Sequence, residues 1–403
     1  MKNRPAQKNI KVAYLLSHPI QYQSPMLKYI SHKQSFDLEV LYLSNMSVEG
    51  YRDSEFQFDV KWDTPLLNGY KYKFLNSIGF QNKISFLFPL CLQIFNELKN
   101  SKYDYLWVHG WGSLTNIFAI ISARKLGIKV LIRGESNLVL PKGSRIKQMA
   151  KFIFLKWLFK NINYFMAIGT LNRKFYEYYG VKTEKIILMP YAVDNEFFQR
   201  QSQSYKGKVT EFKKLNDINQ ESKLILYASK LTNRKNSIDL LLAYEKLLNN
   251  FSDNKPYLFF VGSGEEHFKL SKIVSEKRLD RVRLCGFKNQ SELPEFFEAC
   301  DIFVLPSSAE PWGLVVNEVM NHSKPVIVSD EVGCGADLVE HGVNGFIFKC
   351  RDIDDLSNRL MSLLEDNEKL TGFSCKSLMK INSWSFEEDF LAINQALGQN
   401  HSY

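Results

Sequence analysis

The feature that most constrains the fold of this chain is a series of short, almost continuously apolar runs separated by stretches with helical periodicity. The runs occupy residues 12–16, 38–42, 106–108, 130–132 and 165–168. A strand covered by helices on both faces of a parallel sheet has this composition, whereas a half-exposed strand alternates apolar and polar residues. The sequence therefore predicts an α/β domain built on a doubly wound parallel sheet.

The series is interrupted once, by the polar stretch of residues 199–223, and then starts again. The second set of apolar runs occupies residues 224–227, 258–261, 282–284, 302–305 and 326–328. We therefore expect two tandem Rossmann-like domains, one over residues 1–200 and one over residues 201–380. An amphipathic stretch within residues 381–403 predicts a C-terminal helix that crosses back onto the first domain.

Composition disfavours several other classes of protein. The six cysteines form no C-x-x-C pair and no spacing with histidine that suits zinc, which indicates free thiols in a reducing compartment. The apolar run behind the basic N-terminus is too short for a signal peptide. No run reaches the roughly 20 apolar residues of a membrane span, so we expect a cytoplasmic protein.

The net charge of +9 is concentrated in the first half of the chain, where residues 1–200 hold 28 Lys and Arg against 14 Asp and Glu. Residues 136–176 contain no acidic residue, and their aromatic residues are interleaved with the cations Lys142, Arg145, Lys147, Lys151 and Lys156. This pattern predicts docking on an anionic membrane surface. The alternative is a helix packed on the first sheet, with Phe152, Ile153, Leu155 and Leu158 in the core.

The strongest chemical signal is the segment of residues 306–318, directly after the apolar run 302–305. Open α/β sheets bind ligands at the carboxyl ends of their strands. Pro311 suits the first position of a helix, so we expect the helix to begin there and to leave the amides of Trp312, Gly313 and Leu314 unpaired. Such amides bind anions, and Gly313 lets a diphosphate approach the backbone closely.

Two carboxylates and two lysines complete the predicted donor site. Glu318, two turns into the helix, can reach a ribose through paired hydrogen bonds, and Glu310 faces the sugar beyond the diphosphate. Lys230 and Lys235 follow the apolar run 224–227, where they can neutralise the charge of a departing diphosphate. The alternative for the two lysines is a solvated basic loop.

Several segments resemble retaining glycosyltransferases of family four, which have the two-domain GT-B fold. Residues 310–318 resemble the family's motif of two glutamates separated by seven residues, and residues 262–265 resemble its G-x-G-x turn near the nucleobase. Residues 189–197 and 341–346 resemble two further motifs of the family. The resemblance implies a nucleoside-diphosphate sugar as the donor, with no cofactor and no metal.

The resemblance also implies roles for individual residues. Lys230, which stands where the family usually has arginine, and Lys235 are expected to hold the donor diphosphate. Gly262 is expected near the nucleobase, with Gly313 and Leu314 at the diphosphate. Glu318 is expected to bind the ribose and Glu310 the transferred sugar.

The first domain is expected to provide the acceptor side. Residues 104–110 resemble the family's D-x-x-H-x-H motif, with the second histidine retained as His109. We expect His109 to line the cleft between the domains as a catalytic residue, with a packing histidine as the alternative. The loop of residues 18–25 lacks the family's glycines, so Gln21 or Ser24 is expected to replace the bare backbone. Glu135 is a candidate acceptor contact or an ordinary surface residue.

One pattern suggests a metal site but is better explained as a helix start. Residues 352–355 contain a D-x-D pattern directly before a helical periodicity. Acidic residues at this position cap a helix and complement its dipole. We therefore interpret Asp352 as a helix cap.

The predicted reaction moves a hexose-type sugar to an acceptor hydroxyl with retention at the anomeric carbon. The acceptor is expected to be a glycan or a lipid-linked glycan of bacterial surface polysaccharide synthesis, met by an enzyme held peripherally on the inner face of the membrane. The alternatives are a sugar-nucleotide epimerase or hydrolase of the same fold and a non-catalytic sugar-nucleotide-binding protein. Nucleic-acid binding is disfavoured, because no base-reading motif occurs and residues 201–403 are acidic.

Overall fold

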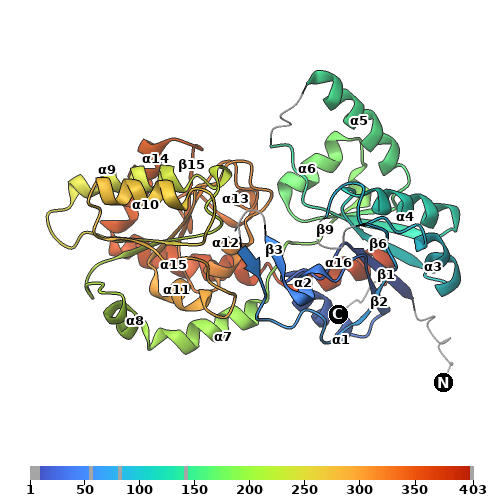
Figure 1. The fold of residues 1–403 in the computed structure, drawn as a ribbon, viewed down its shortest axis with the longest axis horizontal. Coiled ribbons are helices and arrows are strands. Elements are labelled where there is room, and N and C mark those ends of the chain that lie inside the picture. The colour runs from blue at the N-terminus through green and yellow to red at the C-terminus, as the bar shows by residue number, and fades with distance from the viewer. Residues whose placement is uncertain (1–9, 54–57, 80–83, 140–143, 400–403) are drawn as a thin grey trace. The chain divides into compact units, whose positions relative to one another are not determined.

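The computed structural model describes residues 10–53, 58–79, 84–139 and 144–399 (Figure 1). The chain divides into two compact units. Unit 1 contains residues 1–51, 65–190 and 386–403, and unit 2 contains residues 52–64 and 191–385. Among the described residues, every helix is too short or too polar to span a bilayer.

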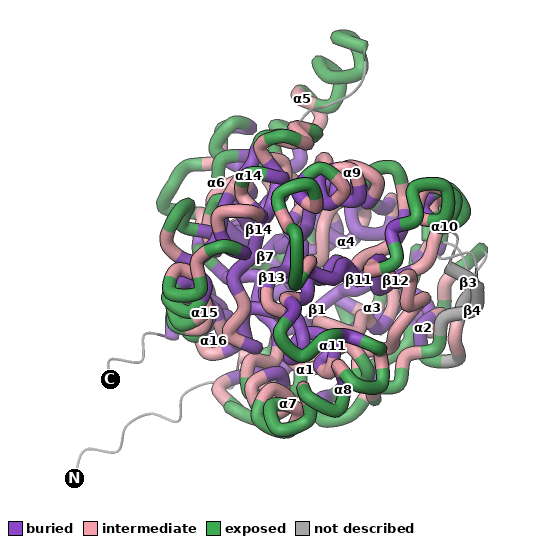
Figure 2. Tube along the Cα trace, turned by 90° about the vertical axis from the view of Figure 1, so that its left-hand side faces the viewer, coloured by how far each residue is buried: buried purple, intermediate pink, exposed green. Residues whose placement is uncertain are grey.

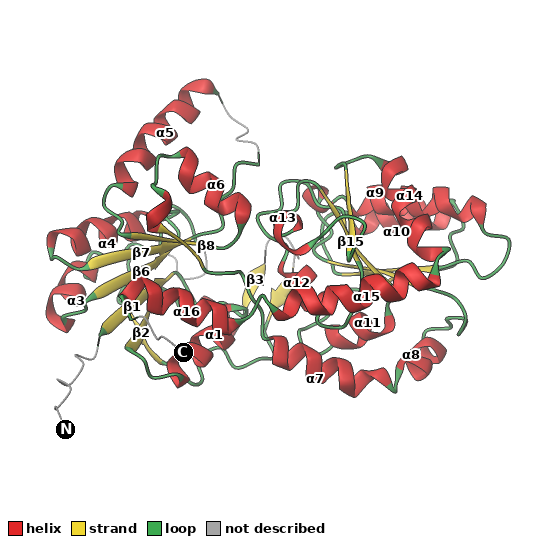
Figure 3. Cartoon of the chain, turned by 180° about the vertical axis from the view of Figure 1, so that it is seen from behind, coloured by secondary structure: helices red, strands yellow, loops and turns green. Residues whose placement is uncertain are grey.

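Unit 1 is built on a seven-stranded parallel sheet with the strand order β5-β2-β1-β6-β7-β8-β9. Its strands are β1 (Lys11–Leu16), β2 (Asp37–Tyr42), β5 (Lys71–Phe74), β6 (Tyr105–His109), β7 (Lys129–Arg133), β8 (Tyr164–Ala167) and β9 (Ile186–Leu188). The central strands consist of Val, Ile, Leu and aromatic residues because helices cover them on both faces, as Figure 3 shows.

The helices of unit 1 divide between the two faces of its sheet. One face shares a core with α3 (Ile94–Ser101), α4 (Leu114–Lys125), α5 (Arg145–Phe159) and α6 (Thr170–Tyr178). The other face carries α1 (Gln23–His32) and the C-terminal helix α16 (Phe386–Leu397). The remaining elements up to residue 190 are α2 (Met46–Glu49), β3 (Tyr51–Asp53), β4 (Phe58–Val60) and the 3-10 turn η1 (Thr183–Lys185). Of these, β4 and most of β3 belong to unit 2.

The predicted return of the C-terminal helix to the first domain is confirmed. Asp389 of α16 lies 3.4 Å from the guanidinium of Arg133, and both side chains are almost completely buried. At the end of α16, the carbonyl of Leu397 accepts a hydrogen bond from the Tyr105 hydroxyl at 3.3 Å. The last helix of the chain is therefore part of the first compact unit.

Unit 2 is built on a six-stranded parallel sheet with the order β12-β11-β10-β13-β14-β15. Its strands are β10 (Leu224–Ala228), β11 (Tyr257–Val261), β12 (Val282–Leu284), β13 (Ile302–Leu305), β14 (Val326–Ser329) and β15 (Gly345–Phe348). The two parallel sheets confirm the predicted fold class.

The helices of unit 2 also lie on both sides of its sheet. They are α7 (Asn195–Lys206), α8 (Val209–Leu215), α9 (Ser237–Leu247), α10 (His267–Glu276), α11 (Leu293–Ala299), α12 (Leu314–Met320), α13 (Gly335–Leu338), α14 (Ile353–Leu364) and α15 (Asn367–Asn382), with 3-10 turns η2 (Asn233–Lys235) and η3 (Leu248–Asn250). The polar stretch of residues 199–223 thus contains most of α7 and all of α8.

The strand orders fix where ligands can bind. In unit 1 the order reverses between β1 and β6, and in unit 2 it reverses between β10 and β13. The loops that leave the carboxyl ends of these strands diverge to opposite faces and leave a crevice at the sheet edge. Functional side chains are therefore expected after Leu16 and His109 in unit 1, and after Ala228 and Leu305 in unit 2.

Candidate functional site

The two loops at the switch point of unit 2 are joined by hydrogen bonds. The Ser308 amide donates to the Arg234 carbonyl at 2.8 Å, and the Asn236 side-chain amide donates to the Pro306 carbonyl at 2.8 Å. These bonds hold the loop after β10 against the loop after β13. Side chains from the two loops therefore meet in a fixed arrangement.

Glu310 and Lys235 meet where these loops touch. The Lys235 ammonium donates a short hydrogen bond to the Glu310 carboxylate, and Arg234 Nη1 lies 3.3 Å from the same oxygen. Glu310 is 8% exposed and Lys235 is 9% exposed. Burial weakens the competition from water around Lys235 and Glu310, whereas the Arg234 side chain is 41% exposed. Two cations against one carboxylate leave a net positive charge, which attracts an anion.

Lys230 precedes Lys235 by five residues in the loop after β10 and is partly exposed. The Leu231 amide donates to the Ser263 carbonyl at 2.9 Å, which ties this loop to the turn after β11. At Gly262 of that turn, φ is +142° and a Cβ atom would lie 1.9 Å from the Ser229 carbonyl oxygen. The missing side chain of Gly262 thus makes room for the neighbouring loop that carries Lys230.

The helix after β13 begins later than predicted. α12 begins at Leu314, not at Pro311, because Gly313 adopts a left-handed φ of +97° at its N-cap. A Cβ atom on Gly313 would lie 2.9 Å from Leu305 Cδ2, so the position also requires a small residue. Among the described residues, the amides of Gly313 and Leu314 have no hydrogen-bond partner. The predicted unpaired amides are therefore present at a helix start three residues further along.

Glu318 lies in α12 and is partly accessible to solvent. Burial raises the pKa of its carboxyl to about 8. No hydrogen-bond or ion-pair partner of this carboxyl occurs among the described residues. A ligand with hydroxyl groups would supply hydrogen bonds that the protein does not.

In unit 1, His109 ends β6 and belongs to a buried polar cluster. Its Nδ1 lies 3.2 Å from the Tyr14 hydroxyl and 3.1 Å from Gln23 Nε2, and the Tyr14 hydroxyl donates to Gln23 Oε1 at 2.8 Å. Burial and the positive charge of Arg133 lower the pKa of His109 to about 3. The imidazole is therefore neutral at physiological pH and can form hydrogen bonds without carrying a charge.

The two candidate acceptor residues differ in their surroundings. Glu135 Oε1 accepts a hydrogen bond from the Tyr22 hydroxyl at 3.1 Å and lies 3.8 Å from His109 Nε2. Gln21 is partly buried, and among the described residues its side chain forms no hydrogen bond with His109 or Glu135. The structure thus brings Glu135 and His109 together, whereas Gln21 is not joined to either by a hydrogen bond.

Gln23 contacts His109, and sequence reasoning missed it. Gln23 opens α1 and shares the buried face of that helix with Leu27 and Ile30, four and seven residues later. A polar residue on the apolar face of a helix is a signal that could have identified it. Ser24 is the alternative to Gln21 as a replacement for bare backbone in the loop of residues 18–25. Its hydroxyl donates a hydrogen bond to the Ile20 carbonyl at 3.1 Å.

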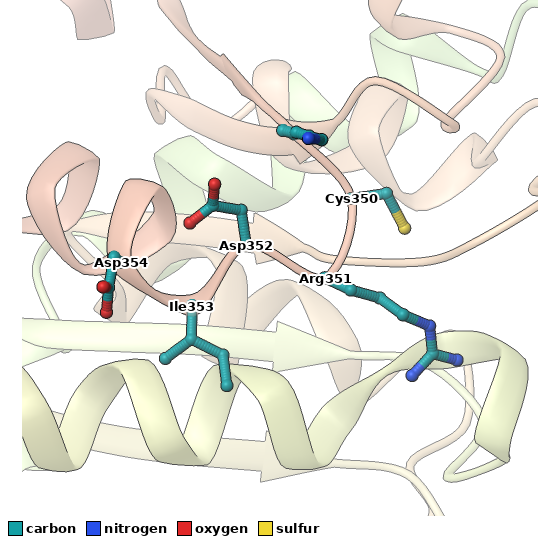
Figure 4. A pocket seen from close by; sticks show the side chains of 6 residues that line it. Cys350, Arg351, Asp352, Ile353 and Asp354 are labelled. Atoms are coloured by element: carbon teal, nitrogen blue, oxygen red, sulfur yellow. The ribbon is translucent and has the colours of Figure 1, made fainter.

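The Asp352 side chain caps α14, which confirms the interpretation as a helix start. It accepts a hydrogen bond from the Asp355 amide at 2.9 Å. A cavity of about 380 Å³ beside it is lined by residues 349–354. Figure 4 shows the Arg351 side chain extending away from Asp352 and Asp354. No cluster of three or more His, Cys, Asp or Glu side chains among the described residues is arranged to hold a metal ion.

Comparison with known proteins identifies relatives of both halves of the chain. Residues 208–376 match the family model described as glycosyl transferases group 1. An uncharacterized glycosyltransferase of Methanocaldococcus jannaschii is 32% identical over 126 residues, which are 31% of this chain and 36% of that protein. The chain thus spans about a third of the length of this relative.

Two longer similarities extend beyond the second unit. A UDP-Gal:alpha-D-GlcNAc-diphosphoundecaprenol alpha-1,3-galactosyltransferase of Escherichia coli is 26% identical over 283 residues, covering 68% of this chain and 70% of that protein. The crystal structure of HepE from Anabaena in complex with UDP aligns with a TM-score of 0.74 at 15% identity, covering 97% of this chain and all of that one. The structural likeness shows that the two proteins share a fold.

Proposed function

We propose that this chain, which has a GT-B-like fold, is a group 1 glycosyltransferase that transfers a sugar from a UDP-sugar to an acceptor hydroxyl with retention at the anomeric carbon. The observation that carries the proposal is the Lys235 and Glu310 pair at the switch point of unit 2. Cations and unpaired amides at that point suit a diphosphate. The E. coli relative is named for a UDP-sugar donor and the Anabaena structure contains UDP, which supports uridine as the nucleoside.

The donor diphosphate is assigned to Lys235, Lys230 and the amides of Gly313 and Leu314. Negative charge grows on the diphosphate as its bond to the sugar breaks. Groups that are already in place where this charge grows lower the barrier more than they strengthen substrate binding. Because the loops carrying Lys235 and Glu310 are hydrogen-bonded to each other, the cation needs little reorganisation during the reaction.

The two glutamates have different assigned roles. Glu310 is close to both Lys235 and Arg234, and we assign it to orienting these cations and to binding the hydroxyls of the sugar. Glu318 has no partner among the described residues and is assigned to the ribose hydroxyls. Gly262 makes space for the Lys230 loop and thereby shapes the donor site.

Retention does not require a nucleophilic side chain in this proposal. The oxygen of the leaving diphosphate accepts the proton of the acceptor hydroxyl on the face from which it departs. His109 is neutral and is assigned to hydrogen bonding in the first unit, where Glu135 is the candidate acceptor contact. These residues orient groups and do not need to change charge during the transfer.

The acceptor is proposed to be a lipid-linked glycan used to build a bacterial surface polysaccharide such as capsule, O-antigen or exopolysaccharide. The name of the E. coli relative, which specifies a diphosphoundecaprenol acceptor, supports this class. The acid-free stretch of residues 136–176 supports a peripheral position on the inner face of the membrane.

The test begins with donor binding, measured by calorimetry against UDP, GDP and other nucleoside diphosphates. We expect UDP to bind most tightly and a UDP-sugar to release UDP rapidly only when a diphospho-lipid-linked glycan is present. Preference for another nucleotide would overturn the donor assignment. Equal release of UDP with and without every acceptor would indicate a hydrolase.

A further inference from the structure

Helix α5 presents an apolar surface that no other described residue of unit 1 covers. Ile146 is 81% exposed, Met149 61%, Ile153 62% and Trp157 49%. Every described residue from 144 to 151 is exposed, and Figure 2 shows this end of α5 standing away from the rest of its unit. Single exposed apolar residues are normal, but four in one short helix form a patch that needs a partner.

The four residues form one stripe, which we call the α5 stripe. At 3.6 residues per turn, they fall within an arc of roughly 80° of the helix circumference. Leu155, Leu158 and Phe159, which are buried in the core of unit 1, fall on roughly the opposite side. The alternative that places Ile153 in the core therefore does not hold, whereas Leu155 and Leu158 are buried as that alternative requires. α5 has one apolar face against the sheet and a second one facing outward.

The charges around the α5 stripe identify its partner. Arg145 and Lys156 lie beside the stripe on the helix circumference, and Lys160, directly after the last residue of α5, falls within its arc. No acidic residue occurs in residues 136–176. Lys142, which was expected to contribute, lies outside the described residues, and the ammonium of Lys151 lies over the Trp111 ring at 5.4 Å. An apolar stripe with a tryptophan and adjacent cations is the composition of a helix that lies in the interface of an anionic bilayer.

A second copy of the chain fits this surface less well. A two-fold symmetric dimer through the stripe would bring the same patch of both copies together. Arg145, Lys156 and Lys160 of one copy would then lie near the same cations of the other, without an acidic residue on the helix to compensate. The charge pattern therefore favours a lipid surface.

Unit 1 has a second exposed apolar segment, near the loop after β6. Phe86 is 51% exposed, Leu87 53% and Leu92 56%. The Phe86 carbonyl accepts a hydrogen bond from the Leu114 amide at 2.7 Å, next to the loop that carries Trp111. The segment with Phe86 and Leu87 thus borders the loop after β6, which begins directly after His109, whereas α5 meets that loop through Lys151, on the side of the helix away from the stripe.

We propose that the α5 stripe inserts into the interface of an anionic membrane and holds unit 1 at the lipid surface. This inference rests on the proposed lipid-linked acceptor, whose diphosphate would lie at that membrane surface. It goes beyond attraction by the cations alone, because the apolar stripe adds a contribution that salt does not screen.

The experiment is sedimentation of the full chain with vesicles of phosphatidylcholine alone or with added phosphatidylglycerol, at low and high salt. We expect binding to the anionic vesicles that is weakened but not abolished by high salt. The double variant Ile146→Gln and Ile153→Gln should bind at least about tenfold more weakly at both salt concentrations. The double variant Lys156→Glu and Lys160→Glu should lose mainly the part of vesicle binding that high salt weakens.

The matched control replaces two equally exposed apolar residues of unit 2, Phe268→Gln and Met379→Gln, which are 79% and 68% exposed. It should bind vesicles like the unchanged protein. Brominated lipid should quench Trp157, and Trp157→Phe should retain binding but lose that quenching. Two vesicle results would overturn the inference: unchanged binding by the Ile146 and Ile153 variant, or an equal loss of binding in the unit 2 control. The inference would also be overturned if the protein does not bind vesicles but forms a dimer that the Ile146 and Ile153 substitutions dissociate.

UDP affinity, measured without vesicles on the same variants, separates this inference from the proposed reaction. We expect it to be unchanged, because α5 and the donor loops belong to different units. A protein that binds UDP and transfers sugar to a water-soluble acceptor but does not bind anionic vesicles would refute the α5 inference alone. A protein that binds vesicles but no nucleotide would refute the proposed function alone.

Discussion

At the scale of single residues, the donor proposal depends on Lys235, a nearly buried cation that contacts Glu310. We expect Lys235→Ala to lower kcat by roughly 10²-fold, because its charge acts mainly on the departing diphosphate. The Kd of UDP should change much less. Steady-state kinetics and calorimetry measure the two quantities separately. A raised KM with unchanged kcat would contradict this role.

The matched control is Lys246→Ala, which removes an exposed lysine of the same unit that pairs with Asp354. Its kcat should equal that of the unchanged enzyme. Glu310→Gln should lose most turnover while circular dichroism stays the same, because it removes the carboxylate that both cations contact.

The raised pKa of Glu318 predicts a pH dependence of nucleotide binding. With a pKa of about 8, the carboxyl of the free protein is largely protonated at pH 7. Ribose hydroxyls donate hydrogen bonds to a carboxylate, so binding favours the deprotonated form. The Kd of UDP should therefore fall as the pH rises from about 7 to 9. Calorimetry of Glu318→Gln, whose side chain does not titrate, should show a flat profile, and a flat profile for the unchanged protein would refute the ribose assignment.

The same group has a consequence for stability. Because its pKa in the folded protein lies above the value of 4.5 for an exposed glutamate, its contribution to stability is full below pH 4.5 and is lost as the pH rises through about 8. The measurement is therefore the free energy of unfolding of Glu318→Gln compared with that of the unchanged protein. The difference should favour the variant more at pH 9 than at pH 5.

At the scale of elements, the contact between the Gly262 turn and the Lys230 loop makes a sharp prediction. Gly262→Ala would place a Cβ atom 1.9 Å from the Ser229 carbonyl oxygen, so the backbone of one loop must move. We expect the free energy of unfolding to fall by about 1–3 kcal/mol and UDP affinity to fall with it. Denaturant unfolding and calorimetry measure these effects.

Gly372→Ala is the matched control for that substitution. Gly372 lies inside α15, and a Cβ atom there would meet no other atom within 4 Å. Alanine has the higher helix propensity, so this variant should gain about 0.5–1 kcal/mol and keep its UDP affinity. Equal stability of the Gly262 and Gly372 variants would show that the turn is not tightly packed.

The elements were largely predictable from sequence, and the exceptions have physical reasons. The apolar runs located the central strands because burial on both faces leaves little choice of residue. The start of α12 was misplaced because Pro311 suits a first helical position, while the left-handed Gly313 delays the helix. The sequence left open whether Ile153 lies in the core, because residue type does not distinguish the two apolar faces of α5. Gln23 was missed because its partner His109 is distant in sequence.

At the scale of the whole molecule, the buried Arg133 and Asp389 pair anchors the C-terminal helix to unit 1. Asp389→Ala should cost about 3–5 kcal/mol of folding stability, because it removes one member of a buried ion pair, and Asp389→Asn should cost less. Thermal unfolding of both variants measures the difference. An unchanged melting temperature for Asp389→Ala would show that α16 does not depend on this pair.

The pH dependence of that pair has a defined sign. Burial raises the pKa of Asp389 to about 7, although Arg133 lowers it. Its stabilising contribution is therefore full below the unfolded value of 3.8 and is lost as the pH rises through about 7. The advantage of the unchanged protein over Asp389→Asn should be larger at pH 5 than at pH 8, and an advantage that grows with pH would contradict this assignment.

The most direct test of the proposed retaining transfer is the anomeric configuration of the product, read by proton NMR after reaction of a UDP-sugar with a diphospho-lipid-linked glycan. The configuration in the donor should be preserved in the new glycosidic bond, and Lys235→Ala should give the same product more slowly. A product of inverted configuration, or free sugar and UDP without a new glycosidic bond, would contradict the proposal that this chain is a retaining glycosyltransferase.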